Sequence, residues 1–241
     1  MRFFTVTMRR GEVQGSRLRA PVTIGRGGLA PVLALAGIFA AFGARVGIPV
    51  VTAALLGGIG GTASLLVHEF GHVRAARRLS GIRSASVSLV WLGAATRFEG
   101  AYATGREQAR VAVAGPCASL ALALSLFGAC FAPMPLTLRE GILALALVNL
   151  LLAVVNLIPA HPLDGHTVVV GLLWWATRSE QKARRIIRRV GFCWAALELP
   201  FAAVLLAERP RLGVVVVVAA AGVFVQKRLV SKPVGIAGSP R

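Results

Sequence analysis

The sequence has few charged residues, and acidic ones are especially rare. Charged residues make up 15% of the 241 positions and only nine of them are acidic, whereas about a quarter of the residues in soluble domains are charged. Hydrophobic residues account for 56%, and several apolar runs reach the length of about 20 residues that crosses a bilayer. This composition excludes an ordinary soluble domain and predicts an all-α polytopic membrane protein.

The shortage of acidic residues leaves a formal net charge of +18. A strongly basic chain can bind nucleic acid, but here Arg and Lys lie between the apolar runs and form no nucleic-acid-binding motif. Cytoplasmic flanks rich in Arg and Lys account for the charge better, because such flanks orient membrane proteins. We therefore expect the lipid bilayer, and no nucleic acid, as a partner.

Cysteine is scarce as well. Cys117, Cys130 and Cys193 lie in apolar segments without C-x-x-C spacing. Three cysteines cannot complete a disulfide framework, and a cysteine in apolar surroundings usually acts as a small hydrophobic residue. We expect no chemistry from them.

The apolar runs divide the chain into a cytoplasmic arm over 1–28, a membrane domain over 29–227 and a cytoplasmic tail over 228–241. About six transmembrane helices are predicted, at 29–46, 50–79, 107–132, 140–158, 190–207 and 212–226. The Arg- and Lys-rich segments place both termini in the cytoplasm. Abundant Arg, Ala, Val and Gly indicate a GC-rich bacterial genome, so we expect the protein in a bacterial cytoplasmic membrane. We expect no accessory domain, because no segment outside the spans reaches the roughly 50 residues that a domain needs.

Two stretches have the pattern of strands rather than helices. Residues 84–91 alternate small polar and apolar side chains, which predicts a strand or hairpin within 82–100 that is too short to span a membrane. The arm contains two β-prone patches, at 3–7 and 22–24, which suggests a short hairpin there.

Histidine and aspartate are rare in this chain, with four and one residues, and they fall in two clusters. Two of the four histidines belong to the sequence HEFGH, which runs from His68 to His72; the other two, His161 and His166, flank Asp164, the single aspartate. Histidines four residues apart lie on one side of a helix, so both can bind one metal ion. The two clusters therefore predict a single metal site built from two elements.

The types of residue in these clusters favour zinc. A catalytic zinc site has three protein ligands and one open position, and His68, His72 and Asp164 supply three. Glu69, beside the first histidine, can act as general base on a water that the metal activates. The alternative for Asp164 is a cap or turn residue before Gly165. Pro159 and Pro162 predict that Asp164 lies on extended or turning backbone.

HEFGH followed by Asn156–Gly165, read as NLIPAHPLDG, resembles the site-2 protease family of intramembrane zinc metalloproteases, in its small form without PDZ or CBS domains. The pair Gly115-Pro116 is similar to the family's Gly-Pro element, and the resemblance covers a catalytic core of about 50–170. It implies a zinc ion inside the bilayer near the cytoplasmic side, held by His68, His72 and Asp164, with Glu69 as the base.

The resemblance also implies further roles. Asn156 would be a catalytic residue near the site, as a substrate or oxyanion contact. Residues 82–100 would form a re-entrant β element whose edge, near Val90 and Leu92, receives an unwound substrate by β-augmentation. The substrate would be a single-pass membrane protein, such as a membrane-bound regulatory factor, cut within or beside the bilayer.

Other polar residues in the apolar runs have simpler explanations. His161 and His166 are expected to be interfacial imidazoles, with a hydrogen bond to a metal ligand or a role in gating as the alternatives. Asn149 is expected to make an interhelical hydrogen bond. Glu198, in the middle of a span, stays an open candidate because an intramembrane carboxylate is costly. Two rival functions are a metal transporter and an inactive homologue that acts as a scaffold. The sequence predicts neither the oligomeric state nor the identity of the substrate.

Overall fold

The computed structural model describes residues 5–6, 20–25, 27–90, 93–187 and 189. Residues 1–184 form one compact unit and 185–241 a second, and the account below concerns the first. The predicted fifth and sixth spans, the tail, Cys193 and Glu198 lie outside the described residues.

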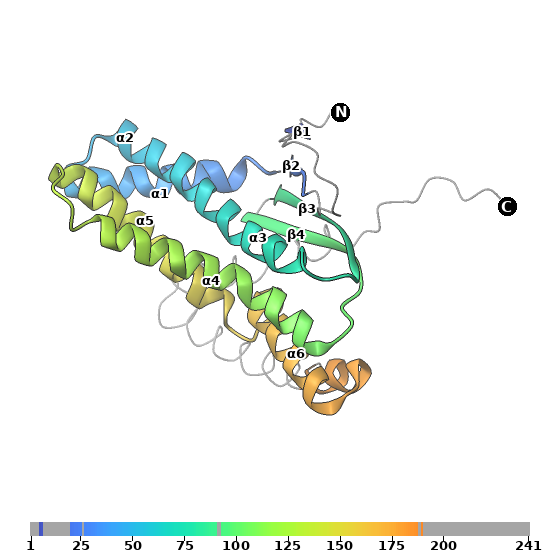
Figure 1. Ribbon diagram of the computed structural model, residues 1–241. Helices are drawn as coiled ribbons and strands as arrows, with labels where there is room; N and C mark the ends of the chain where they lie inside the picture. The colour runs from blue at the N-terminus through green and yellow to red at the C-terminus, as the bar shows by residue number, and fades with distance from the viewer. Residues whose placement is uncertain (1–4, 7–19, 26, 91–92, 188, 190–241) are drawn as a thin grey trace, which may run out of the picture. The chain divides into compact units, whose positions relative to one another are not determined.

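The described part is mostly helical (Figure 1). Its helices are α1 (Ala30–Val46), α2 (Val50–Leu55), α3 (Thr62–Ala76), α4 (Gly105–Ala129), α5 (Leu136–Asn156) and α6 (Asp164–Thr177). Among these residues three helical stretches are long and apolar enough to cross a membrane: Val50–Ala76, Gly105–Ala129 and Leu136–Asn156. The predicted first span is α1, a shorter apolar helix of 17 residues.

The helix that carries HEFGH begins with a glycine-rich half. A π-helical segment, Leu56–Gly61, joins α2 to α3 without a break in the helical run. A side chain at Gly57 would strike Phe39 of α1, with its Cβ 2.5 Å from that of Phe39. The glycines therefore let α1 lie directly against this segment, and small residues are common at such helix interfaces in membranes.

A four-stranded sheet lies beside the helices (Figure 1), in the order β1 (Thr5–Val6), β2 (Val22–Ile24), β3 (Ile82–Val90) and β4 (Gly93–Gly100). β1 and β2 are antiparallel, β2 and β3 are parallel, and β3 and β4 are antiparallel. The two β-prone patches of the arm are thus strands of the same sheet as residues 82–100, which the sequence had not predicted. Parallel pairing joins segments about 65 residues apart, and no local pattern reports it.

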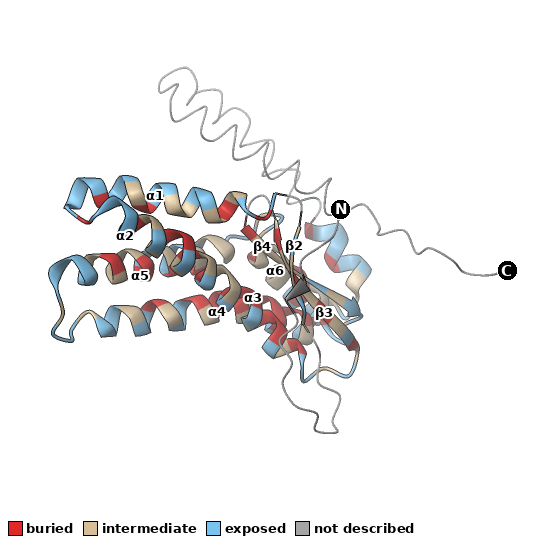
Figure 2. Cartoon of the chain, turned by 90° about the horizontal axis from the view of Figure 1, so that it is seen from above, coloured by how far each residue is buried: buried red, intermediate tan, exposed pale blue. Residues whose placement is uncertain are grey.

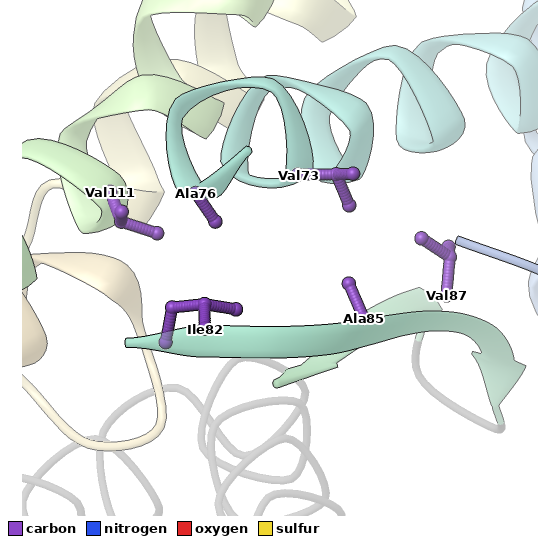
Figure 3. Close-up of a cluster of buried hydrophobic side chains, with 6 residues drawn as sticks. All are labelled: Val73, Ala76, Ile82, Ala85, Val87 and Val111. Carbon is purple, nitrogen blue, oxygen red and sulfur yellow. The ribbon is translucent and has the colours of Figure 1, made fainter. Parts of the chain in front are cut away.

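The sheet packs one face on α3. Val73 and Ala76 of α3 face Ile82, Ala85 and Val87 of β3 in a buried apolar cluster (Figure 3). A register shift between Ile82 and Ser84 lets the side chain of Ile82 join the same face, because an extra residue in a strand reverses the alternation that follows. This cluster fixes β3, and with it β4, against the helix that carries HEFGH.

Many large apolar side chains remain exposed on the helices. Figure 2 shows exposed residues along α1 and at the ends of α4 and α5 that lie away from the sheet. Leu33, Ile38, Leu124, Phe127 and Leu151 are each at least half exposed. Soluble proteins rarely expose apolar patches of this extent, so the surface agrees with a bilayer environment.

Candidate metal centre

Close packing of α3 against α4 creates the site. Gly71, inside HEFGH, lies against α4 so closely that a Cβ there would be 2.5 Å from the carbonyl oxygen of Ala114 and 2.8 Å from the Cβ of Ala118. Glycine at this position therefore allows the backbones to approach. It brings both histidines, which are buried, against the surface of α4.

Each histidine ring is held by a hydrogen bond to α4. Nδ1 of His72 lies 2.8 Å from the carbonyl oxygen of Val111, and Nδ1 of His68 lies 2.9 Å from Oγ of the fully buried Ser119. A carbonyl oxygen only accepts, so Nδ1 of His72 carries the proton and its Nε2 carries a lone pair. The Ser119 hydroxyl can accept in the same way from His68. Both imidazoles are thereby oriented through the nitrogen that does not face the site.

The third potential ligand, Asp164, follows the connection between α5 and α6. The backbone is extended at Leu163, and α6 begins at Asp164, so the aspartate is the first helical residue rather than part of a turn as predicted. An acidic residue is favourable in a first helical turn because of the helix dipole. Gly165 lies against the carbonyl oxygens of Leu157 and Ile158, where a side chain would not fit. This contact places Asp164 beside the end of α5.

The three side chains converge on one point. Oδ2 of Asp164 lies 3.0 Å from Nε2 of His68 and 3.3 Å from Nε2 of His72. The candidate ligand atoms all lie within 4.8 Å of one another. Among the described residues, this is the one group of at least three potential metal ligands of this kind. Two imidazole nitrogens and a carboxylate oxygen that face one point can bind a cation there, and this donor set fits zinc.

Gly115 of α4 keeps that space open. A Cβ at this position would lie 2.8 Å from Nε2 of His68, and closer still to Nε2 of His72. Val111, Gly115 and Ser119 are spaced four residues apart, so they form one stripe of α4 that faces the histidines. Pro116, next to this stripe, is fully buried. The Gly-Pro pair therefore faces the site and the protein, which is the environment that a proline in a membrane span needs.

Glu69 is buried beside the histidines and is held from the sheet. The hydroxyl of Thr96, in β4, donates to Oε2 of Glu69 over 2.6 Å. Thr96 could not be predicted from the sequence, because the alternation within a strand does not show which hydroxyl will contact a helix. The strand alternation does carry part of that signal, since Ala94, Thr96 and Phe98 share one face and Phe98 packs on the apolar cluster.

Two asparagines of α5 behave differently. Asn149 is fully buried, and its Nδ2 donates to Oγ of Ser64 on α3 over 2.8 Å, which confirms the predicted interhelical bond. Asn156 is the last residue of α5, and its Nδ2 donates over 2.9 Å to the carbonyl oxygen of Leu152 in the same helix. Among the described residues, no hydrogen bond joins Asn156 to the ligand group, and its role stays a prediction.

His161 and His166 lie together, with ring centroids 5.3 Å apart. They line a polar cavity of about 460 Å³. Tyr102, which precedes α4, Gln108 of α4 and several residues of α6 line it as well. Burial raises the pKa of Tyr102 to about 12, so its hydroxyl stays protonated at neutral pH. Neither imidazole belongs to the three-ligand group.

The fold and the site define a helical membrane protein with a buried cluster of two histidines and an aspartate beside a glutamate. The sequence matches the profile of peptidase family M50 over residues 58–142 and 134–197, more than half of the chain. The chain therefore belongs to peptidase family M50, which confirms the recognition made from its motifs.

Individual relatives agree with this assignment. The chain is 36% identical over 140 residues to sll0528 of Synechocystis, and 40% identical over 136 residues to Rip3 of Mycobacterium tuberculosis; both are named as zinc metalloproteases. These matches cover 57% and 53% of this chain but only 37% and 34% of the relatives. The chain thus spans about a third of the length of the curated relatives it matches.

One solved structure shares the fold. The site-2 protease from Methanocaldococcus jannaschii superposes with a TM-score of 0.59 and 18% sequence identity, covering 99% of this chain and 100% of that one. At this identity the likeness concerns the fold alone.

Proposed function

We propose that this protein is an intramembrane zinc metalloendopeptidase that cuts membrane-spanning proteins within or next to the bilayer. The observation that carries the proposal is the convergence of His68, His72 and Asp164 on one point, with Glu69 buried beside them. Membership of peptidase family M50 and relatives named as zinc metalloproteases support zinc as the metal and peptide hydrolysis as the reaction.

The protein's own residues divide the work. His68, His72 and Asp164 would hold the zinc ion through Nε2, Nε2 and Oδ2. Zinc at this position would polarise a water molecule and the carbonyl of the scissile peptide bond. Glu69 would accept a proton from the attacking water and return it to the leaving amine. Ser119 and the carbonyl of Val111 hold the two imidazole rings in the orientation that this requires.

Metal removal tests the proposal. Purified protein in detergent should cut at least one of a panel of tagged single-span membrane proteins, and should contain about one zinc ion per chain by elemental analysis. A chelator such as 1,10-phenanthroline should abolish cleavage, and added zinc should restore it, because the water is activated only when the metal is bound. Uptake of zinc into vesicles without any cleavage would instead support the transporter alternative.

Substrate binding at the sheet is a second part of the proposal. Proteases bind extended backbone, so a transmembrane substrate must unwind, and the outer edge of a sheet can receive it. The predicted location of that edge, around Val90, was wrong. Val90 ends β3, an inner strand that pairs with both β2 and β4; Leu92 lies outside the described residues. The described sheet has two edge strands, β1 and β4, and β4 is the one that contacts Glu69.

The register shows which groups of β4 point outward. The amide of Val87 donates to Pro21, and the carbonyl of Leu89 accepts from Gly25, so these two residues of β3 bond toward β2. The intervening Ser88 therefore bonds toward β4, and its partner is Ala95. By the alternation of antiparallel pairs, the backbone groups of Ala94, Thr96 and Phe98 point away from β3. Thr96 is the residue bonded to Glu69, so this edge borders the site.

Proline at Ala94 tests the edge. The substitution removes one outward amide and leaves the bonds to β3 in place, and proline is tolerated at such edge positions. We expect Ala94→Pro to raise KM at least about tenfold and to leave the zinc content unchanged, because a lost substrate hydrogen bond weakens binding. Ala94→Val, which keeps the amide, is the matched control. Equal KM values for the two variants would rule out pairing at this position.

We further propose the arrangement in the membrane. Six transmembrane helices would place both termini in the cytoplasm of a bacterial cell, with 82–100 as a re-entrant element. Residues 1–28 and 228–241 would lie outside the spans as arm and tail, although β1 and β2 of the arm pair within the sheet. Asn156, at the end of α5, would contact substrate once the substrate is bound.

A further inference from the structure

Glu69 and the outer edge of the sheet meet at one residue, Thr96. The Thr96 hydroxyl donates to Oε2 of Glu69 over 2.6 Å, and the same hydroxyl lies 3.5 Å from the backbone oxygen of Glu69. Thr96 pairs with Val87, which is fully buried in the cluster against α3. The strand therefore cannot move relative to α3 without disturbing that cluster, and the hydroxyl is held at a fixed place.

Thr96 has the one hydroxyl on the face of β4 that lies toward α3. Residues on the α3-facing side of β4 are Ala94, Thr96 and Phe98, and Thr96 is the polar one of the three. Oε2 of the glutamate accepts from it inside a buried site, where a hydrogen bond to an ionised group is stronger than one between neutral groups. The bond also limits rotation of the carboxylate.

We propose that Thr96 is a positioning residue for the general base, and that it ties the base to the strand edge on which substrate binds. Its side chain orients Glu69, while its own backbone groups point outward at that edge. This inference rests on the proposed protease function. A substrate strand paired with β4 would lie next to a base that the same residue has already oriented.

Substitutions at Thr96 separate orientation from binding. Thr96→Val keeps the shape and the β-branched character but removes the hydroxyl. With the single-span protein that is cut fastest, we expect kcat to fall about 10- to 100-fold, the range that a hydrogen bond to a charged group is worth. KM should change less than about twofold and the zinc content should stay the same, since the backbone edge and the ligands are intact. Thr96→Ser should recover most of kcat.

Ser84→Ala is the matched control. Ser84 also donates from a strand hydroxyl to a carboxylate, Oε2 of Glu99, over 2.6 Å, but at an exposed position. It should leave kcat unchanged. Wild-type kcat in Thr96→Val, or a kcat as low in Thr96→Ser as in Thr96→Val, would overturn the positioning role, since the first removes the effect and the second assigns it to packing.

A measurement independent of cleavage keeps the inference testable if no panel protein is cut, which would count against the proposed function. Thermal unfolding in detergent is compared for wild type, Thr96→Val, Glu69→Ala and the double variant. Thr96→Val should lower the Tm in the wild-type background and have little effect beside Glu69→Ala, because the bond it removes is already absent there. An equal fall in both backgrounds would overturn the inference.

Discussion

Glu69→Gln should reduce cleavage about 100- to 10,000-fold while the protein keeps its zinc. A general base contributes rate factors in this range, and an amide cannot accept the proton at neutral pH. The ligand group of His68, His72 and Asp164 does not include Glu69, so metal binding should survive. The amide oxygen of glutamine can still accept from Thr96, so the side chain should keep its place. Initial rates and elemental analysis on the same preparation measure both quantities.

Glu99→Gln is the appropriate control for that experiment. Glu99 lies three residues beyond Thr96 in β4 and also accepts a hydrogen bond from a strand hydroxyl, but it is exposed. It should cleave at the wild-type rate. Cleavage by Glu69→Gln at the wild-type rate would remove Glu69 from the mechanism, whereas loss of zinc would show that the carboxylate supports the metal instead.

The chemistry of the site could be predicted from the sequence because the relevant residue types are rare in this chain. With four histidines and one aspartate, the pairing of HEFGH with Asp164 left few alternatives, and the structure brings these side chains together. The likeness of Gly115-Pro116 to the family's Gly-Pro element was informative as well, because Gly115 lies against both histidines. Costly residues in apolar surroundings are the strongest signals that such a sequence carries.

The supporting contacts could not be predicted, because their residue types are common and their partners are distant. Ser119 lies 51 residues from His68, and Thr96 lies 27 residues from Glu69. Serine and threonine occur at many other positions, and in a helix their hydroxyls can donate to a backbone carbonyl of the preceding turn. The parallel pairing of β2 with β3 could not be predicted for a similar reason. The three residues of β2 give no indication of a partner strand about 65 residues later in the chain.

The start of α6 differs from the expectation that Asp164 lies on extended or turning backbone. Pro159 and Pro162 do stop the helix of α5, as predicted. The sequence rule did not say where the next helix begins, and it begins at Asp164 itself. A ligand in the first turn of a helix is held more firmly than one on a turn, because its backbone dihedrals are fixed by the helix and by the close contact of Gly165 with α5.

Gly115→Ala should abolish zinc binding and cleavage together, through a single methyl group. The added Cβ would lie 2.8 Å from Nε2 of His68 and closer to Nε2 of His72, in the space between the ligands. The rings cannot turn aside without losing their bonds to Val111 and Ser119, which belong to the same helix as Gly115. We expect zinc affinity to fall at least about 100-fold, at the upper end of losses seen when groups supporting a metal ligand are changed. Elemental analysis and titration with a competing chelator measure the affinity.

Gly128→Ala on the same helix separates this steric effect from helix stability. A Cβ at Gly128 meets nothing within 4 Å. Alanine favours a helix interior by about 0.5–1 kcal/mol relative to glycine, and by less at Gly128, the second-to-last residue of α4. Gly128→Ala should therefore raise the Tm slightly and retain full zinc and activity. If Gly115→Ala also retained zinc and activity, α4 would have to lie farther from the histidines than it does here, and the compact ligand group would not be the metal site.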